Sequence, residues 1–368
     1  MDTLKLKASV HKDKIESYVR AAESLRRNAT NPQDVTLSDV LEQQADGISM
    51  AELYADLGID PCQDTIQNLF TVPDASIRWL VPEIFRDALR LGLRKAPIYP
   101  NIIAAEQSIK NLTATIPSWN MSDAKAKYIG EGESISMGTV SVGSRDIKVR
   151  KIGRGIKVSY EVKNYVAINV VSIFLQDFGV RLGYGIDTML IDVLLNGDQG
   201  TGVEAAPVIG VAATATVAYK DLLTIWVRMA RLGRTPTVII AGETVAINTL
   251  SLPEFATNMG SGPTVNNLNL KTPVPKNTDY YIHGNVPASK SIIIDTTSAV
   301  IKFNAQPLLV ETEKIVSNQT EATYATLTTG FGTIIRDARV VMDQSQTIGA
   351  MPFPTYMDPT QDENIVFD

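Results

Sequence analysis

The stretch YEVKNYVAINVVSIFLQDFGVRLGYGIDTMLIDVLLNGDQGTG, residues 160–202, is the part of the chain around which the rest is organised. Its large apolar side chains recur at steps of three and four residues, which places them on one stripe of a helix. Such a helix would have about 25 to 30 residues and a length of roughly 40 Å. Because this is more than twice the mean helix length of about 11–12 residues, we expect it to act as a strut. The stripe consists of Val171, Phe174, Leu175, Phe178, Leu182, Ile186, Met189, Leu190 and Val193.

Both ends of this helix carry sequence signals. Asn164 or Asn169 can cap its start, because an Asn side chain accepts a hydrogen bond from a backbone N–H of the first turn. Asn196-Gly197-Asp198 predicts its end, since Gly adopts the left-handed conformation easily and Asn and Asp tolerate it. Asp192 and Asp198 could together bind a cation, but the helix end explains Asp198 more simply.

Composition and charge are those of an ordinary globular protein. The chain has 368 residues, 44% hydrophobic and 20% charged, which is enough for two or three folding units. Its net charge of −6 argues against a dedicated nucleic-acid-binding protein, which is usually basic. Cys62 is the single cysteine, which excludes an intrachain disulfide and a thiolate-rich metal site. We find no signal-peptide or membrane-spanning run, and we expect a soluble protein made in the cytoplasm with no membrane partner.

Residues 1–75 form a charged front segment in two halves. Residues 1–30 read as a polar helix rich in Lys and Arg, whereas residues 31–77 contain nine acidic residues and no basic one. Short helices are predicted at 37–45 and 50–57. The segment has few large apolar residues and no catalytic pattern. We expect either an appendage that docks on another molecule or a solvated charged extension.

The next stretch predicts a helix followed by a long hairpin. An apolar stripe runs through IRWLVPEIFRDALRLGLRKA, residues 77–96, where Pro82 either begins the helix or kinks it. Strands are predicted at 112–117, 147–152 and 155–158, around a polar, Gly-rich stretch at 122–143. A hairpin over 124–147 has little core of its own, so it must be disordered or lie on another molecule.

Helices and strands alternate in the remainder, which predicts a mixed α/β unit. Residues 344–368 are Pro-rich and acidic, and we expect this tail to dock rather than fold. The predicted helices are 219–232 and 243–250, and the predicted strands are 237–241, 280–283, 292–295, 303–310 and 323–327, with a return through 331–343.

Four motifs, taken in order, carry a family resemblance. They are Val81-Pro82-Glu83 before the hairpin, Glu131-Gly132 within it, the long helix, and LLNGDQGTG followed by PVIGV at 207–211. This order resembles the major capsid proteins of tailed double-stranded-DNA bacteriophages, which share the Hong Kong 97 capsid fold. The resemblance implies an α+β fold with an N-terminal arm, an extended β-hairpin loop, a long spine helix, a peripheral domain and an axial domain.

The resemblance also divides the chain. The implied segments are the charged helical extension 1–75, the arm 76–120, the extended loop 121–160, the spine helix 161–196, the axial domain 197–297, the peripheral strands with their return to the axial domain 298–343, and the tail 344–368. In the family, the place of residues 1–75 often holds a scaffolding domain. We expect here an extension that is retained on the inner face or along neighbouring copies.

The function implied is structural rather than enzymatic. Such a protein self-assembles into hexamers and pentamers that form the icosahedral head around double-stranded DNA, in the virion, after assembly in the host cytoplasm. A portal is an expected partner, and scaffold or decoration proteins remain open. One branch of the family crosslinks its subunits through a Lys in the extended loop. No Lys lies between Lys127 and Lys148 here, so we expect no covalent mesh.

Candidate contact residues follow from the same resemblance. Glu131 and Glu133 would face basic residues of a neighbouring copy, with Arg181 as the first candidate. The turn near Ser317-Asn318 resembles the loop that meets its copies at three-fold positions. Charged residues beside this turn are Glu311, Glu313 and Lys314, and residues that could face DNA are Lys12, Lys14, Arg26 and Arg27.

We predict no catalytic, cofactor-binding or metal site. His11 and His283 are far apart in sequence, and no HExxH motif or Cys/His cluster occurs. The Gly patterns at 153–155 and 260–262 lack a following Lys-Ser/Thr and read as turns. Two alternatives stay open. One is an encapsulin-type compartment of the same fold that encloses a cargo enzyme, and the other is an enzyme of mixed α/β fold.

Overall fold

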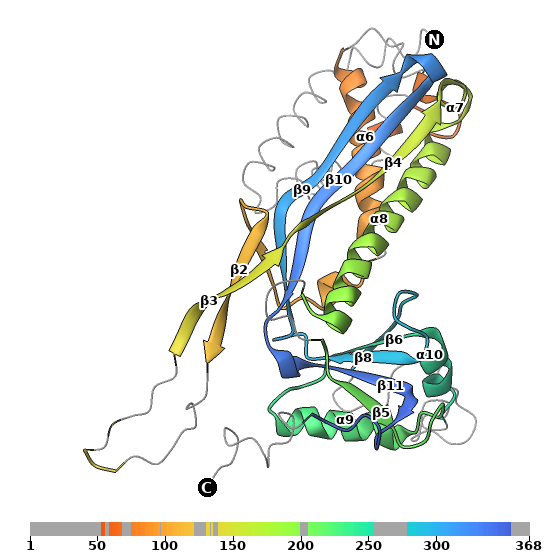
Figure 1. The fold of residues 1–368 in the computed structure, drawn as a ribbon. Coiled ribbons are helices and arrows are strands. Elements are labelled where there is room, and N and C mark those ends of the chain that lie inside the picture. Colours follow the sequence, from red (N-terminus) through yellow and green to blue (C-terminus); the bar gives the residue numbers. More distant parts are fainter. Residues whose placement is uncertain are drawn as a thin grey trace. The chain divides into compact units, whose positions relative to one another are not determined.

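A computed structural model shows the fold, and it describes residues 53–55, 59–67, 75–95, 97–120, 130–132, 134, 139–198, 205–252 and 278–354. Helices and strands are mixed, as predicted for the α+β class (Figure 1). The chain separates into two compact units. Unit 1 comprises Met1–Pro97, Lys151–Asp187 and Gln306–Thr329, and unit 2 comprises Ile98–Arg150, Thr188–Ala305 and Gly330–Asp368.

Two helices lie in direct backbone contact in unit 1. They are α6, Ala75–Lys95, and α8, Ile168–Asn196, whose first part belongs to this unit. A Cβ atom built on Gly92 would lie 2.0 Å from the carbonyl oxygen of Gln176, and one built on Gly179 would lie 2.1 Å from that of Leu89. Only Gly fits at these two positions. Helix α6 runs through Pro82, so the alternative that the helix begins at this residue is wrong.

The long helix has the predicted length, and of the two predicted caps Asn169 accepts a first-turn hydrogen bond, from Val170 N to Asn169 Oδ1 at 2.7 Å. Helix α8 has 29 residues and ends at Asn196, and Gly197 follows with φ +83°. A short helix, α7, Tyr160–Tyr165, precedes it and is capped by Ser159, whose Oγ accepts from Val162 N at 3.3 Å. Asn164 lies inside α7 and Asn169 is already the second residue of α8. The break between the two helices was not predicted.

The predicted apolar stripe of α8 needs one correction. Phe174 is 61% exposed, whereas Val171, Leu175, Phe178, Leu182, Ile186 and Leu190 are buried. At about 100° per residue, Phe174 lies at the margin of the stripe, on the side of Ile173, which is 64% exposed. The steps of three and four residues that include Phe174 therefore placed it on the wrong side of the boundary between core and surface.

A four-stranded sheet has the order β1-β9-β10-β4 (Figure 1). Its strands are β1, Ala105–Ser108; β9, Val300–Ile315; β10, Thr320–Thr333; and β4, Arg150–Ser159. Strand β1 is parallel to β9, from Ala105 opposite Ile301 to Ser108 opposite Asn304. Strands β9 and β10 contribute residues to both units. They are joined through the short 3₁₀ helix η2, Val316–Asn318, after which Gln319 has φ +48°.

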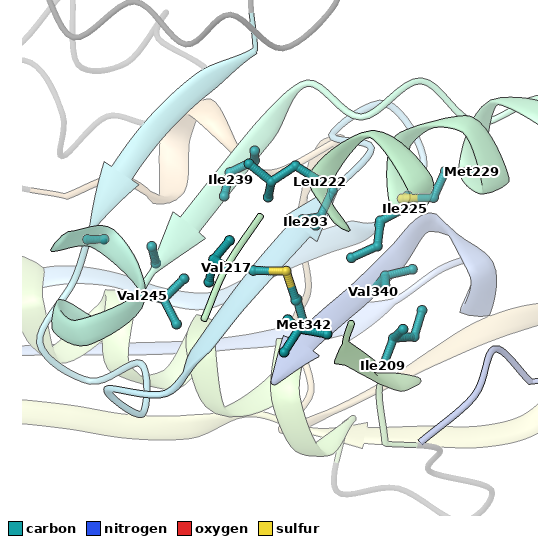
Figure 2. Close-up of a cluster of buried hydrophobic side chains, with 13 residues drawn as sticks. Ile209, Val217, Leu222, Ile225, Met229, Ile239, Val245, Ile293, Val340 and Met342 are labelled. Carbon is teal, nitrogen blue, oxygen red and sulfur yellow. The ribbon is translucent and has the colours of Figure 1, made fainter. Parts of the chain in front are cut away.

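A five-stranded sheet with two helices forms the principal core of unit 2. Its order is β5-β11-β8-β6-β7, and the pairs β5–β11 and β6–β7 are parallel. Figure 2 shows side chains from α9 and α10 meeting those of the strands in one apolar cluster. The elements are β5, Val208–Val211; α9, Tyr219–Arg231; β6, Val238–Ala241; α10, Glu243–Leu250; β7, Asp279–Ile282; β8, Lys290–Ile294; and β11, Arg339–Thr347.

The remaining strands form a two-stranded hairpin, also in unit 2. Strand β2, Thr113–Asn120, pairs antiparallel with β3, Thr139–Lys148, from Thr113 opposite Lys148 to Asn120 opposite Thr139. A small core at its base joins Ala114, Ile147, Val149 and Phe303. The pairing therefore starts within the predicted arm. Two further short 3₁₀ helices are η1, Tyr99–Asn101, and η3, Arg336–Ala338, and residues 53–55 of the front segment are also helical.

Candidate assembly surfaces

The end of unit 1 at α7 and the start of α8 exposes a cluster of large apolar side chains. Tyr165 is 84% exposed, Ile173 is 64% exposed and Phe174 is 61% exposed, with Val162 and Val170 beside them in sequence at 37% and 38%. We call these five residues the apolar cluster. Single exposed apolar residues are normal, but a group of this size commonly marks a contact with another molecule.

The same exposed face of α8 continues with an ion pair. Arg181 Nε lies 2.7 Å from Asp177 Oδ2, one helical turn earlier, and both side chains are more than half exposed. Arg181 was predicted to meet Glu131 or Glu133 of a neighbouring copy. Within this chain its partner is Asp177. An exposed pair four residues apart contributes only about 0.3–0.5 kcal/mol, so it can be exchanged for another partner.

The hairpin presents one of its two predicted contact residues. Glu131 is exposed beside Gly132, which has φ +88°, a conformation that suits Gly in a turn. Glu133 lies outside the described residues. The two strands form a sheet of their own, and an isolated two-stranded hairpin is only marginally stable in water. The described core of the hairpin lies at its base.

The other predicted contact residues lie close to the turn between β9 and β10. Glu311, Glu313 and Lys314 are all exposed in the last part of β9, and Val316 in the turn is 74% exposed. The base of this turn is tied to α7. Lys163 Nζ lies 2.5 Å from Glu321 Oε2, with both side chains largely buried, and Tyr160 N donates to Gln319 O at 3.0 Å. No local pattern could have predicted the Lys163–Glu321 pair, because 158 residues separate its members.

Part of the front segment packs on the start of α8. Ile168 N donates to Asp64 O and Asn169 N donates to Pro61 O, both at 3.1 Å, and Thr65 forms a β-bridge with Ala167. The acidic part of the front segment therefore has a described anchor in unit 1. Other predicted residues of this segment, which could face DNA, lie outside the described residues: Lys12, Lys14, Arg26 and Arg27.

The part of the chain that the structure describes contains buried and partly buried titratable groups, among them His283 and Tyr280. No group of three or more His, Cys, Asp or Glu in this part of the chain could hold a metal ion. Burial lowers the pKa of His283, which favours its neutral form, and burial raises the pKa of Tyr280 to about 12. Cys62 is exposed and accepts a weak contact from Asn169 Nδ2 at 3.6 Å. Asp198 accepts from Thr333 N and Oγ1, both at 3.2 Å.

A family model described as "Phage capsid protein" matches residues 141–344, which is more than half of the chain. This chain belongs to that phage capsid protein family. The match begins inside β3 and ends inside β11, so it includes α8, the five-stranded sheet and most of the four-stranded sheet. The predicted resemblance to phage capsid proteins is confirmed at the level of the family. Proteins of this family are structural components of the virion.

Solved structures similar to this capsid protein are distant in sequence. A virus-like particle from Pyrococcus furiosus has 12% identity and a TM-score of 0.47, covering 70% of this chain and 96% of the other. A structure from Mycobacterium phage Bobi has 12% sequence identity and a TM-score of 0.48, and the match covers 68% of this chain and 90% of that chain. The capsid of the native GTA particle has 12% sequence identity and a TM-score of 0.48, and the match covers 69% of this chain and 89% of that chain. No curated protein matches the capsid protein.

A search of the capsid protein's described helices for membrane spans found none that is both long and apolar enough to cross a bilayer.

Proposed function

We propose that this capsid protein self-assembles into hexamers and pentamers that form an icosahedral, Hong Kong 97-like head around double-stranded DNA. The family match supports a capsid role. The observation that supports self-assembly most directly is the apolar cluster on α7 and α8, of which Tyr165, Ile173 and Phe174 are more than 60% exposed. Exposed apolar area of this kind is stabilised when another molecule buries it.

In this proposal the hairpin of one copy lies over the exposed face of α8 of a neighbour. Burial of the apolar cluster would give the favourable free energy, and the hairpin would gain a partner for its uncovered faces. Glu131 would reach basic residues of the neighbour, where Arg181 can exchange its bond to Asp177 for a bond between copies. The β9–β10 turn, with Glu311, Glu313 and Lys314, would meet its copies at three-fold positions.

Many weak contacts made at once explain how such a shell persists. When one copy is already held at one surface, its other surfaces bind at a high effective concentration, so modest contacts become collectively strong. The portal, and a scaffold or decoration protein where one is used, would bind the same shell. Assembly would take place in the host cytoplasm. The front segment would lie on the inner face or along neighbours, with Lys12, Lys14, Arg26 and Arg27 available to DNA.

Electron microscopy of the purified protein tests this function. We expect closed shells for the natural chain and only small oligomers for the double variant I173S/F174S, which removes the centre of the apolar cluster. Both side chains are more than 60% exposed, so the variant should fold as the natural chain does. V227S on α9, where the side chain is 48% exposed, is the matched control and should still form shells.

The same particles distinguish the possible contents. Protection of DNA against added nuclease supports the phage-head function, whereas a single cargo enzyme found by mass spectrometry would establish the encapsulin-type alternative. A monodisperse monomer at high concentration would exclude both. A denaturing gel of the particles should show one band at the monomer mass, because the hairpin lacks a Lys between Lys127 and Lys148. A ladder of covalent multimers would contradict that expectation.

A further inference from the structure

Strand β4 carries an unusual charge pattern for a protein of net charge −6. Its sequence, RKIGRGIKVS, contains four basic residues and no acidic one. Lys151, Arg154 and Lys157 lie in unit 1 and are exposed, and none of them forms an ion pair with a described residue. The single carboxylate of the neighbouring strand β10, Glu321, is already bound to Lys163. These three cations therefore have no described carboxylate to neutralise them.

The geometry of the strand spreads this charge along one edge of the sheet. Strand β4 is the last strand in the order β1-β9-β10-β4. Lys151 and Lys157 point to the same face, since they are an even number of residues apart, and roughly 20 Å separates their positions at about 3.3 Å per residue. Arg154 points to the other face. Long side chains from both faces can reach a ligand that lies along this edge.

Between the two lysines, Tyr324 and Thr326 of strand β10 lie against the two glycines of β4. A Cβ atom on Gly153 would lie 2.6 Å from Thr326 Cγ2, and one on Gly155 would lie 2.7 Å from Tyr324 Cδ1. The side chains of Tyr324 and Thr326 therefore occupy the space over the two glycines, and Tyr324 is 37% exposed. Tyr and Thr hydroxyls are common donors to the phosphates and sugars of DNA, together with Lys and Arg.

We propose that this edge, formed by Lys151, Arg154, Lys157 and Tyr324, contacts the phosphate backbone of double-stranded DNA. The inference rests on the proposed function and names the surface that meets the enclosed DNA. A duplex carries about one charge per 1.7 Å with both strands counted, so 20 Å of duplex contains roughly a dozen phosphates, of which those on the near side can meet this edge. A protein partner fits the edge less well, because Lys is depleted from the buried centres of protein interfaces.

The test measures binding of the full-length protein to a fluorescein-labelled 30-base-pair duplex of mixed sequence, by fluorescence anisotropy at several salt concentrations. In the triple variant K151Q/R154Q/K157Q we expect at least about tenfold weaker binding at 50 mM salt, and a salt slope smaller by about 2 to 3. The control K110Q/K220Q/R231Q removes the same charge from exposed residues outside unit 1, and should bind nearly as the natural chain does.

Equal weakening in both triple variants would overturn the proposal, since net charge alone would then explain binding. Unchanged binding in the β4 variant would overturn it as well. Microscopy of the same samples is an independent readout. Loss of shells with full DNA binding would assign β4 to contacts between copies instead. A natural chain that binds DNA through β4 but forms no shell would contradict the proposed function and leave this inference standing.

Discussion

The five-stranded sheet and the β2–β3 hairpin belong to the same unit, yet they differ in the size of the apolar core that the described residues form around them. Helices α9 and α10 pack on this sheet, and residues of the shared cluster such as Val245, Val340 and Met342 have no exposed surface at all. The hairpin has two strands and a small core at its base. One region has a large core of its own, whereas the described core of the other is small and lies at its base.

This difference separates folding from assembly. A substitution in the self-contained sheet should change the stability of a single copy. A substitution in the hairpin or in the apolar cluster should leave a single copy folded and change what copies do together. The two kinds of effect can be measured separately, by denaturation of the unassembled protein and by electron microscopy.

The largest expected effect is on assembly. Residues 121–138 are replaced by Asn-Gly, a dipeptide that favours a tight hairpin turn and joins Asn120 to Thr139, which are opposite each other. We expect complete loss of shells with an unchanged unfolding midpoint, because the core at the base of the hairpin is retained. Shells of normal size from this variant, seen by electron microscopy, would remove the hairpin from the assembly contacts.

The next effect concerns the self-contained sheet. Ile225 on α9 is 2% exposed inside the cluster of Figure 2, and Ile225→Ala should lower the free energy of unfolding by about 2–5 kcal/mol. Val227, two residues along the same helix, is 48% exposed, and Val227→Ala should cost less than about 0.5 kcal/mol. Urea denaturation of the unassembled protein measures both. Equal losses would mean that α9 is not packed as described.

A smaller effect is expected where α6 meets α8. Gly179→Ala places a methyl group 2.1 Å from the carbonyl oxygen of Leu89, and the helices must separate, at a cost of about 1–3 kcal/mol or more. Gly185→Ala on the same helix is the control, because its nearest neighbour, Ile152 Cγ2, is 3.8 Å away. This control should be neutral or stabilising, since Ala is the better helix former. Thermal denaturation distinguishes the two variants.

A fourth prediction concerns pH and the tie between β1 and β9. Burial alone would raise the pKa of Glu106, but hydrogen bonds from Lys302 and Asn304 and the charge of Lys302 lower it below its usual value. Because the folded-state pKa is the lower one, the stabilisation is present above the unfolded-state pKa and is lost as pH falls through the folded value. Glu106→Gln should therefore be less stable than the natural chain at pH 7.

That difference should shrink toward pH 3, where the natural chain also loses the Glu106–Lys302 ion pair. Chemical denaturation of the unassembled protein at both pH values is the measurement. Glu311→Gln, at an exposed position of the same strand β9, is the control and should show little change at either pH. A stability gap for Glu106→Gln that is the same at pH 7 and pH 3 would contradict the assignment.

The smallest effect concerns the exposed pair on α8. Asp177→Ala removes the partner of Arg181 and should cost only about 0.3–0.5 kcal/mol in the unassembled protein. If Arg181 pairs with Glu131 of a neighbour in the shell, Arg181→Ala should slow assembly more than Asp177→Ala does. Light scattering at matched protein concentration compares the two. Equal assembly rates would leave Arg181 without a role between copies.

The periodic elements could be predicted from the sequence, because their signals are local. Helix α10 matches its predicted range of 243–250, helix α9 ends one residue before the predicted 232, and the end of α8 follows from Asn196-Gly197. The apolar cluster could not be predicted. Phe174 lies at the margin of the apolar stripe, where the period alone does not fix the boundary between core and surface, and in the structure it is 61% exposed while Val171 is buried.

The pairing between strands that are distant in the chain could not be predicted from the sequence either. The parallel pairs β1–β9 and β5–β11 join residues about 200 and 130 positions apart, and a strand's own pattern does not identify its partner. Strands β9 and β10 were predicted as 303–310 and 323–327, but they extend over Val300–Ile315 and Thr320–Thr333, because polar residues continue the ladder beyond the apolar run. The domain boundaries of the charged extension, the arm and the tail stay predictions.

The glycine contact between α6 and α8 has a mechanical consequence. Packed helices usually slide by repacking their side chains, but here a shift that brought Leu175, one turn before Gly179, to the place of Gly179 would drive its side chain against the backbone of Leu89. Sliding in that direction is blocked, and we expect the two helices to move together. The amide hydrogen-exchange rates of α6 and α8 should then change in the same direction, for example between the unassembled protein and the shell.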